Sequence, residues 1–370
     1  MTPRIVFVLG TRPEIVKLAP IIRACEQGDI EHTVIHTGQH YSDRLDAVFF
    51  EDLELKPPDV NLDIGSGPHG QQTGEMLLGL GEQIRAADPD AVIVQGDTNS
   101  ALAGGLVASK LDTKLCHVEA GLRSFDQEMP EEVNRVLIDH VADHLFAPTE
   151  EAARYLRTEG IPEEYIEVTG NTIVDAVEQN AALAASKSDA LDELGVVPGE
   201  FALMTAHRAG NVDDRDRFTG LLDGIAKYAE ITGLRVIYPV HPRSEEKIDE
   251  FDISVPDPIN CVKPLNFLDF LRLETTASIV FTDSGGVQEE TCILGTPCVT
   301  VRQNTERPET LEVGSNVLAE PNPDSIVEAA FDIKTGTADW ESPFGDGNAA
   351  QYILESLGAE VPAVTEVVRA

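Results

Sequence analysis

The feature that most constrains the fold is a repeated pattern of a short apolar run, a turn that contains glycine or aspartate, and a helix-like segment. An apolar run without alternation is typical of a parallel strand that helices cover on both faces. The clearest runs are Arg4 to Leu9, Ala91 to Val94, Phe201 to Met204 and Ala277 to Phe281. The pattern therefore predicts an α/β fold with parallel sheets.

This pattern occurs in both halves of the chain, and 370 residues are too many for one ordinary hydrophobic core. Between the halves, the segment from Asn180 to Pro198 is rich in alanine, serine and aspartate and has weak apolar periodicity. We place the connection between two domains near this segment. The sequence predicts two parallel-sheet domains that face each other across a cleft.

The charge of the chain is strongly negative. Asp and Glu number 65 against 27 Lys and Arg, which gives a formal net charge of −38, and 18 of the 27 basic residues are arginine. Acidic residues spread along the whole chain, together with a shortage of lysine, favour adaptation to high salt, where self-repulsion is screened. Such a surface argues against nucleic acid or an anionic membrane as a partner.

Targeting and metal-binding signals are also lacking in the sequence. No apolar run approaches the length of a membrane span, and the N-terminus enters a strand-like segment without a signal-peptide layout. These observations predict a cytoplasmic protein. The five cysteines form no CxxC pair and no zinc-like spacing, which predicts reduced, buried thiols and no metal site.

The stretch from His117 to Arg135 (HVEAGLRSFDQEMPEEVNR) contains two candidate catalytic carboxylates. Glu119 directly follows an apolar run, and Glu131 lies at a helix start that Pro130 opens. Asp97 follows the preceding apolar run. Carboxylates just beyond strand ends lie at the edge where open α/β sheets bind ligands. Taken alone, the stretch does not argue for a site over a solvated acidic loop, and Asp97 by itself is better explained as a helix N-cap.

Two glycine-containing segments in the first half are candidates for binding phosphate. Gly10-Thr11-Arg12-Pro13-Glu14 joins the first apolar run to a helix, and Arg12 and Lys17 add positive charge to the helix N-terminus. This arrangement predicts an anion site. The segment from Gly65 to Gly70 matches GxGxxG literally, but it contains Pro68 and lacks a good preceding strand. We reject it as a dinucleotide-binding motif and expect a loop.

The second half has its own phosphate-binding candidate, the segment DSGGVQEE from Asp283 to Glu290. Its two glycines let backbone N–H groups approach phosphate oxygens, and the dipole of the following helix favours an anion. Glu290 falls one turn into that helix, where a carboxylate can accept hydrogen bonds from ribose hydroxyls. With Arg307 nearby, the segment favours a nucleoside diphosphate over a plain strand–turn–helix connection.

Together, these motifs make the chain resemble the non-hydrolysing UDP-N-acetylglucosamine 2-epimerases over essentially its full length. The matching motifs are GTRPEIVKLAP, TGQH, QGDT, HVEAGLRS, PEEVNR, GNTIVDA, AHR, HPR, DSGGVQEE and TERPE. The resemblance implies a GT-B arrangement of two Rossmann-like domains with a final helix that crosses back to the first domain. Residues 1–172 plus 352–370 would then form one domain and residues 173–351 the other. It also implies a homodimer and a UDP-sugar substrate, without a metal or a nicotinamide cofactor.

The resemblance also assigns individual residues by their positions in these motifs. The catalytic residues that it implies are Asp97, Glu119, Glu131 and His207. The substrate-binding residues that it implies are Arg12 and Lys17 in the first domain and Leu265, Phe270, Ser284, Gly285, Gly286, Glu290 and Arg307 in the second, with Phe270 beside the uracil. One motif departs from the family, because the usual HR-x-EN has Gly210 in place of its Glu.

The chemistry of the implied reaction explains why these residue types are needed. The C2 hydrogen of UDP-N-acetylglucosamine is not next to a carbonyl, so direct deprotonation gives no stabilised carbanion. Elimination of UDP across C1–C2 avoids this, and cations and backbone amides must then hold the leaving group. Crowded carboxylates can differ in pKa, so that one acts as an acid while another acts as a base. We expect reversible epimerisation through 2-acetamidoglucal.

Three other functions are compatible with parts of the sequence. A hydrolysing 2-epimerase would share the fold and the carboxylates but release free N-acetylmannosamine. A GT-B glycosyltransferase would explain the UDP site but not three carboxylates in the first half. A non-catalytic UDP-sugar sensor would bind without turnover, and Gly210 is the one feature that leaves this alternative open.

Overall fold

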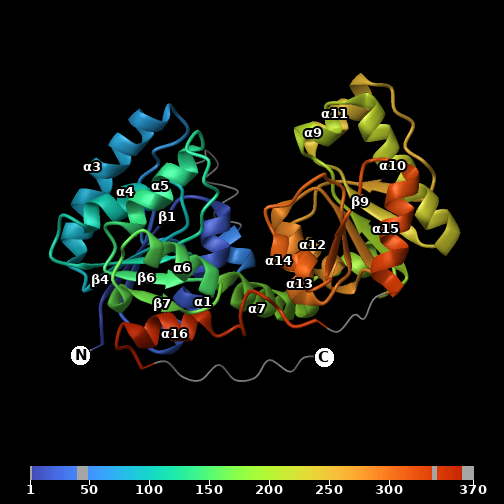
Figure 1. The fold of residues 1–370 in the computed structure, drawn as a ribbon. Helices are drawn as coiled ribbons and strands as arrows, with labels where there is room; N and C mark the ends of the chain where they lie inside the picture. The colour runs from blue at the N-terminus through green and yellow to red at the C-terminus, as the bar shows by residue number, and fades with distance from the viewer. Residues whose placement is uncertain (1, 40–48, 336–339, 361–370) are drawn as a thin grey trace. The chain divides into compact units, whose positions relative to one another are not determined.

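The computed structural model describes residues 2–39, 49–335 and 340–360, and His40 of the TGQH motif lies outside them. The chain forms two compact units. Unit 1 consists of Met1–Gln179 and Phe344–Ala370, and unit 2 consists of Asn180–Pro343. Unit 2 is therefore inserted, in sequence, between the two segments of unit 1 (Figure 1).

Unit 1 is built on a seven-stranded sheet in the order β3-β2-β1-β4-β5-β6-β7, and every described pair is parallel. The strands are β1 (Ile5–Leu9), β2 (His32–His36), β3 (Val60–Asn61), β4 (Ala91–Gln95), β5 (Lys114–Val118), β6 (His144–Ala147) and β7 (Ile166–Val168). The strand order reverses between β1 and β4. Open α/β sheets bind ligands at such a switch point, beyond the carboxyl ends of the strands.

Helices cover this sheet. They are α1 (Arg12–Gln27), α3 (His69–Ala87), α4 (Asn99–Ala108), α5 (Pro130–Asp139), α6 (Glu150–Thr158), η1 (Glu163–Tyr165), α7 (Thr172–Lys187) and α16 (Ala349–Ser356). In Figure 1, α3, α4 and α5 lie on one side of the strands and α16 on the other. The last residues of α7 belong to unit 2, because the division between the units follows Gln179.

Unit 2 repeats this architecture with a six-stranded parallel sheet in the order β10-β9-β8-β11-β12-β13. Its strands are β8 (Phe201–Met204), β9 (Arg235–Pro239), β10 (Ile259–Val262), β11 (Ile279–Thr282), β12 (Cys298–Thr300) and β13 (Asn316–Leu318). Its helices are α8 (Ala190–Leu194), α9 (Ala209–Val212), α10 (Arg215–Thr232), α11 (Pro242–Glu250), α12 (Phe267–Thr276), α13 (Gly285–Leu294), α14 (Pro308–Glu312) and α15 (Pro323–Thr335). The switch point lies between β8 and β11.

Apolar side chains from the strands form the cores between sheet and helices. All five residues of β1 are buried, as the unbroken apolar run predicted. In unit 1, Val6 and Val8 pack in one cluster with Met76 and Leu80 of α3. The two parallel sheets with helices confirm the predicted α/β class with two Rossmann-like domains.

The final helix packs on the first unit. Helix α16 contacts α1, and its first turn is held by Asp175 of α7, which accepts hydrogen bonds from the backbone N–H groups of Ala349 (3.3 Å) and Ala350 (3.0 Å). Burial raises the pKa of Asp175 to about 6. The helix that was expected to return to the first domain is therefore fixed there by a buried carboxyl group.

The structure also bears on membrane insertion and on the cysteines. Among the residues it describes, no helix combines the length and apolar character needed to cross a bilayer. The five cysteines are unpaired, and four of them are buried as expected. Cys261 is exposed, so the expectation of a buried thiol is wrong at that position. It lies in β10, one of the two edge strands of the unit 2 sheet.

Candidate active site

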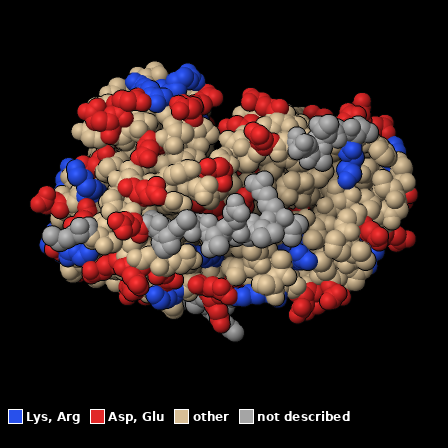
Figure 2. Space-filling view, turned by 90° about the horizontal axis from the view of Figure 1, so that it is seen from below, with Lys and Arg blue, Asp and Glu red and all other residues tan. Residues whose placement is uncertain are grey.

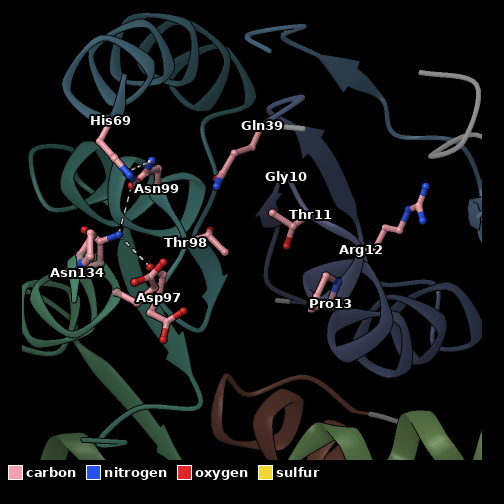
Figure 3. A pocket seen from close by; sticks show the side chains of 12 residues that line it. Gly10, Thr11, Arg12, Pro13, Gln39, His69, Asp97, Thr98, Asn99 and Asn134 are labelled. Carbon is pink, nitrogen blue, oxygen red and sulfur yellow. Dashed lines mark hydrogen bonds between the residues drawn. The ribbon is translucent and has the colours of Figure 1, made fainter. Parts of the chain in front are cut away.

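A pocket of about 510 Å³ lies at the carboxyl edge of the unit 1 sheet, at the switch point between β1 and β4 (Figure 3). The loop after β1 and the N-terminal ends of α4 and α5 form most of its wall. Its lining residues are Gly10, Thr11, Arg12, Pro13, Gln39, His69, Asp97, Thr98, Asn99, Pro130, Glu131 and Asn134. Three of the predicted site residues, Arg12, Asp97 and Glu131, therefore come together around one cavity.

Asp97 lies at the turn between β4 and α4, with its Oδ2 atom 2.5 Å from Nη2 of Arg135. Burial raises the pKa of Asp97 against the opposing charge of Arg135, and the Glu119 carboxylate adds to the increase. Asp97 therefore keeps a proton more readily than an ordinary aspartate does. The catalytic role of Asp97 stays a prediction.

The simpler explanation of Asp97 as a helix N-cap is wrong. The N-cap of α4 is Thr98, whose Oγ1 atom accepts a hydrogen bond from the backbone N–H of Ala101 at 3.0 Å. The backbone carbonyl of Asp97 accepts a hydrogen bond from Asn134 Nδ2 at 2.8 Å, which ties the start of α5 to this turn (Figure 3). The side chain of Asp97 is thus left to face the pocket and Arg135.

Glu119 is held by three donors at the end of β5. Lys17 Nζ lies 2.6 Å from Oε1, Asn171 Nδ2 donates to the same oxygen at 2.9 Å, and Gln95 donates to Oε2. Glu119 is buried, and its φ of 67° lies in the left-handed region, which is uncommon for residues other than glycine. Such backbone strain often occurs at functional sites. Lys17, predicted to bind the substrate, and Glu119, predicted to be catalytic, therefore form an ion pair with each other.

Glu14 is a buried carboxyl group that sequence analysis did not select. Its Oε2 atom accepts hydrogen bonds from the backbone N–H of Gly10 (3.0 Å) and from Thr11 Oγ1 (2.8 Å), and its Oε1 atom from Thr98 Oγ1 (2.7 Å). Burial raises the pKa of Glu14 to about 7, although these hydrogen bonds oppose the shift. Glu14 therefore joins the loop after β1 to the loop after β4, on both sides of the pocket. Its position inside the GTRPE motif is the feature of the sequence that could have identified it.

The HVEAG motif contributes a second buried network behind the pocket. Both ring nitrogens of His117 are engaged, Nδ1 with Asp139 Oδ1 (2.6 Å) and Nε2 with the carbonyl oxygen of Gly96 (2.8 Å). Asp139 also pairs with Arg123 Nη1 at 2.7 Å. This network fixes the backbone of Gly96, the residue immediately before Asp97.

Glu132, which follows the predicted catalytic Glu131, holds a turn of the backbone in place. Its carboxylate accepts hydrogen bonds from the backbone N–H groups of Ser124 (2.9 Å) and Phe125 (3.0 Å) and from Ser124 Oγ (3.0 Å). Burial alone would raise the pKa of Glu132, but these hydrogen bonds outweigh it and the pKa is lowered. Glu131, by contrast, is exposed and lines the pocket.

In unit 2, the loops after β8 and β11 meet at the switch point. Asp283, fully buried after β11, accepts hydrogen bonds from the backbone N–H groups of His207 (3.0 Å) and Arg208 (3.0 Å), and its Oδ1 atom lies 3.1 Å from Nδ1 of His207. Burial would raise the pKa of Asp283, but the contacts with His207 and Arg208 hold it below its usual value. Asp283, which was not selected as a site residue, thus sets the position of the predicted catalytic His207.

The Gly210 departure is accommodated locally. A β-carbon built on Gly210 would meet no atom within 4 Å among the described residues, so this position has space for a side chain. Asn211 keeps the motif anchored, because its Nδ2 atom donates to the carbonyl oxygen of Val301 at 2.9 Å and to Asp283 Oδ2 at 3.3 Å. The positions of His207 and Arg208 therefore do not depend on a side chain at residue 210.

The DSGG segment forms the N-terminal end of α13. Ser284 is the N-cap residue, and Gly285 and Gly286 form the first turn, where backbone N–H groups lack helical acceptors. Glu290 lies further along the same helix, beside the fully buried Glu274 of α12. Burial and the neighbouring Glu290 carboxylate raise the pKa of Glu274 well above its usual value. Glu274 therefore keeps a proton more readily than an ordinary glutamate does, beside the residue predicted to bind ribose.

The other predicted UDP-binding residues lie in the same unit. Arg307 precedes α14, and its Nε atom is 2.6 Å from Glu289 Oε1. Leu265 and Phe270 are partly buried against the core cluster that includes Leu203 and Val287. The predicted site residues thus form two groups, one in each unit. That both groups bind one UDP-sugar stays a prediction.

Metal coordination has no clear candidate among the described residues, since no three His, Cys, Asp or Glu side chains are grouped so that they could hold an ion. The polar groups of unit 1 instead engage one another. Lys17 pairs with Glu119, and Arg135 pairs with Asp97, which lines the pocket.

Comparison with known proteins relates this chain to one family. The family model described as UDP-N-acetylglucosamine 2-epimerase matches residues 23–358. A UDP-N-acetylglucosamine 2-epimerase of Methanocaldococcus jannaschii is 48% identical over 356 residues, which cover 95% of this chain and 97% of that protein. A solved structure of the UDP-GlcNAc 2-epimerase from that organism has a TM-score of 0.89 at 46% identity, covering 96% of this chain and 99% of the other.

A second structure of the Methanocaldococcus jannaschii enzyme was solved in complex with UDP-GlcNAc and UDP. It has a TM-score of 0.81 at 47% identity and covers 96% of this chain and 99% of the other. The similarity therefore extends through both units. The paired Rossmann-like domains are those of a GT-B-like fold.

Proposed function

The chain belongs to the UDP-N-acetylglucosamine 2-epimerase family, and on that basis we propose that it interconverts UDP-N-acetylglucosamine and UDP-N-acetylmannosamine without net hydrolysis. The observation that carries this proposal is the grouping of Arg12, Asp97 and Glu131 around one pocket, with the Lys17–Glu119 pair close by. A glycosyltransferase has no need of three carboxylates at this edge of the sheet. The product would supply the synthesis of surface polysaccharides or glycoprotein glycans.

The proposed reaction is an elimination followed by an addition. A base takes the C2 proton, the C1–O bond breaks with its electron pair going to UDP, and a C1=C2 double bond gives 2-acetamidoglucal. On return, a UDP oxygen adds to C1 and a proton is delivered to the opposite face of C2. The sugar undergoes no net oxidation or reduction, so the proposed reaction needs no redox cofactor.

We assign different parts of the reaction to the residues of the two units. Asp97, Glu119 and Glu131 handle the protons, and positioned proton transfer of this kind contributes roughly 10²- to 10⁴-fold. The raised pKa of Asp97 supports a role as a proton donor in one direction and an acceptor in the other. His207, held by Asp283, is the further catalytic group contributed by unit 2.

UDP binding is assigned to the loops of unit 2. Ser284, Gly285 and Gly286 offer backbone N–H groups to the diphosphate. The remaining assigned contacts are Glu290 for the ribose, Phe270 and Leu265 for the uracil, and Arg307 with Arg12 and Lys17 for the phosphates and sugar.

The deciding experiment is turnover of UDP-N-acetylglucosamine in heavy water at high salt, followed by NMR. The expected result is UDP-N-acetylmannosamine with deuterium at C2 and a small pool of UDP and glycal. Epimer without deuterium at C2 would rule out proton exchange by elimination. Free N-acetylmannosamine as the main product would instead identify a hydrolysing enzyme, and a requirement for an acceptor would identify a transferase.

We also propose that the protein forms a homodimer. Val133, Leu137 and Val141, spaced four residues apart along α5 and its end, are 45%, 45% and 36% exposed, which is unusual in a chain of net charge −38. The test is light scattering of the L137D variant against a control, I231D, which alters an apolar position of unit 2 that is more exposed, at 57%. Only L137D should yield monomers, and a monomeric wild type would refute the proposal.

A further inference from the structure

Three charged side chains gather at the N-terminal end of α13. Arg302 binds the Glu306 carboxylate through two hydrogen bonds, from Nη1 to Oε2 (2.7 Å) and from Nη2 to Oε1 (2.8 Å). Arg208 Nη1 approaches the same carboxylate, 3.3 Å from Oε1. Glu306 therefore joins two arginines that come from different loops, one after β8 and one after β12.

This group lies directly beside Gly285, the first residue of α13. A β-carbon placed on Gly285 would be 3.7 Å from Arg208 Nη2 and 3.9 Å from Glu306 Oε2. The N-cap residue Ser284 forms no capping hydrogen bond through its side chain within the described chain. The carboxylate of Glu306 is thus an anion placed next to the glycines assigned to the diphosphate.

We propose that Glu306 is a resident counter-ion, which holds Arg208 and Arg302 in the absence of nucleotide and is displaced when the diphosphate of UDP binds them. The inference rests on the proposed function, because it takes UDP as the ligand of this loop. It adds two phosphate-binding arginines to the site and makes nucleotide binding an exchange of anions.

The chemistry of the three side chains favours replacement of the Glu306 carboxylate by a phosphate over a permanent ion pair. Carboxylates and phosphates are both bound by guanidinium groups through paired hydrogen bonds, so one can replace the other on the same arginine. The Glu306 side chain is 52% exposed, and exposed ion pairs are weak, whereas a diphosphate carries more charge. Hydrogen bonding from Arg302 lowers the pKa of Glu306 to about 2, so the carboxylate competes at any working pH.

The neighbouring Arg307 has a different environment. Its Nε atom lies 2.6 Å from Glu289, whose side chain is only 7% exposed and belongs to α13 itself. An ion pair with a buried partner is less readily exchanged than one with an exposed partner. Arg302 and Arg208 are therefore better placed than Arg307 to transfer from a carboxylate to a phosphate.

The test is calorimetric binding of uridine, UMP and UDP to the full chain at one fixed salt concentration. The variants are Glu306→Gln, Arg302→Gln and a control, Asp324→Asn, which removes one charge from an exposed ion pair with Lys227 elsewhere in unit 2. Glu306→Gln should bind UDP about threefold tighter and uridine unchanged. Arg302→Gln should bind UDP about tenfold more weakly. Asp324→Asn should match the wild type with all three ligands.

Weaker UDP binding by Glu306→Gln, or an equal change for uridine and UDP, would overturn the inference and identify Glu306 as a structural latch. Glu306→Ala, with thermal unfolding of each variant, repeats the test if the amide perturbs folding. The proposed function is judged separately by turnover. If the wild type binds UDP but does not epimerise UDP-N-acetylglucosamine, only the proposed function is refuted. If the wild type is active but Glu306→Gln does not bind UDP more tightly, only the proposed exchange of Glu306 for the diphosphate is refuted.

Discussion

The carboxyl group of Glu14 illustrates how one residue can make the stability of the fold depend on pH. Its folded pKa of about 7 lies above the ordinary value of 4.5, so the folded state binds the proton more tightly than the unfolded chain does. The stabilisation is complete below the unfolded pKa and is lost as the pH rises through the folded pKa. From about pH 5 to about pH 8 the loss amounts to roughly 2 to 3 kcal/mol.

Replacing Glu14 by Gln should remove this component. We expect the free energy of unfolding of Glu14→Gln to fall less between these pH values than that of the wild type, by about 2 kcal/mol. Urea unfolding at both pH values measures the difference. Parallel pH dependence of the two proteins would show that Glu14 does not titrate in this range.

Two adjacent residues allow catalysis and stability to be separated. Glu131 is exposed at the pocket, so Glu131→Gln should lower kcat by at least about 10²-fold with little change in Tm. Glu132 holds the turn at Ser124 and Phe125, so Glu132→Gln should lower Tm and reduce kcat less than about tenfold below the melting range. Initial rates and thermal unfolding of both variants check this, and the reverse pattern would exchange the two roles.

The positions of site residues could be predicted from sequence where a motif follows a strand, and their partners could not. Asp97 and Glu119 were selected as candidates because apolar runs end just before them. The Lys17–Glu119 pair joins residues 102 apart in sequence, and Arg208 meets Glu306 across 98 residues. Such contacts depend on how loops of separate strands converge, which periodicity does not contain. Glu14 was missed because a first-turn acid is usually only a favourable charge at a helix N-terminus.

At the level of elements, the strands were readily predicted because continuous apolar runs are distinctive. Helix ends were predicted less well. The two glycines of DSGGVQEE were expected to precede the helix, but α13 begins at Gly285, so both glycines are part of the helix. The segment from Gly65 to Gly70 was expected to be a loop, but α3 already begins at His69 after the short β3. The rejected GxGxxG match therefore does precede a helix, although its strand has only two residues.

Helix α16 depends on one side chain of another element. Asp175 of α7 accepts the first backbone N–H groups of α16, so Asp175→Ala should release this helix and cost about 1 to 2 kcal/mol. Hydrogen exchange of the α16 amides should accelerate while that of β1 stays protected. The control is Glu355→Gln, which alters an exposed carboxylate on α16 itself. Equal exchange in Asp175→Ala and the wild type would show that packing on α1 suffices.

For the whole molecule, the dominant property is charge. Figure 2 shows acidic side chains spread over the visible face of both units. Repulsion among them acts over a screening length of about 10 Å at 0.1 M salt and about 3 Å at 1 M. We therefore expect Tm to rise by roughly 5 °C or more between about 0.1 M and about 2 M KCl.

An uncharged solute separates screening from general stabilisation. Sucrose at matched osmolality strengthens apolar burial without screening charges. It should therefore raise Tm less than KCl does. An equal increase, or a Tm that is unchanged by KCl, would argue against salt adaptation and leave the negative charge without a role in stability.

The division of unit 1 into two segments has a consequence for the order in which the protein folds during synthesis. The ribosome releases all of unit 2 before it releases α16, because residues 180–343 precede Ala349–Ser356. Domains generally fold as units as they emerge. Unit 2 can therefore complete its core while the pocket-bearing unit still lacks its last helix. Unit 1, whose strands are synthesised first, therefore completes its folding last, when the N-terminal end of α16 reaches Asp175.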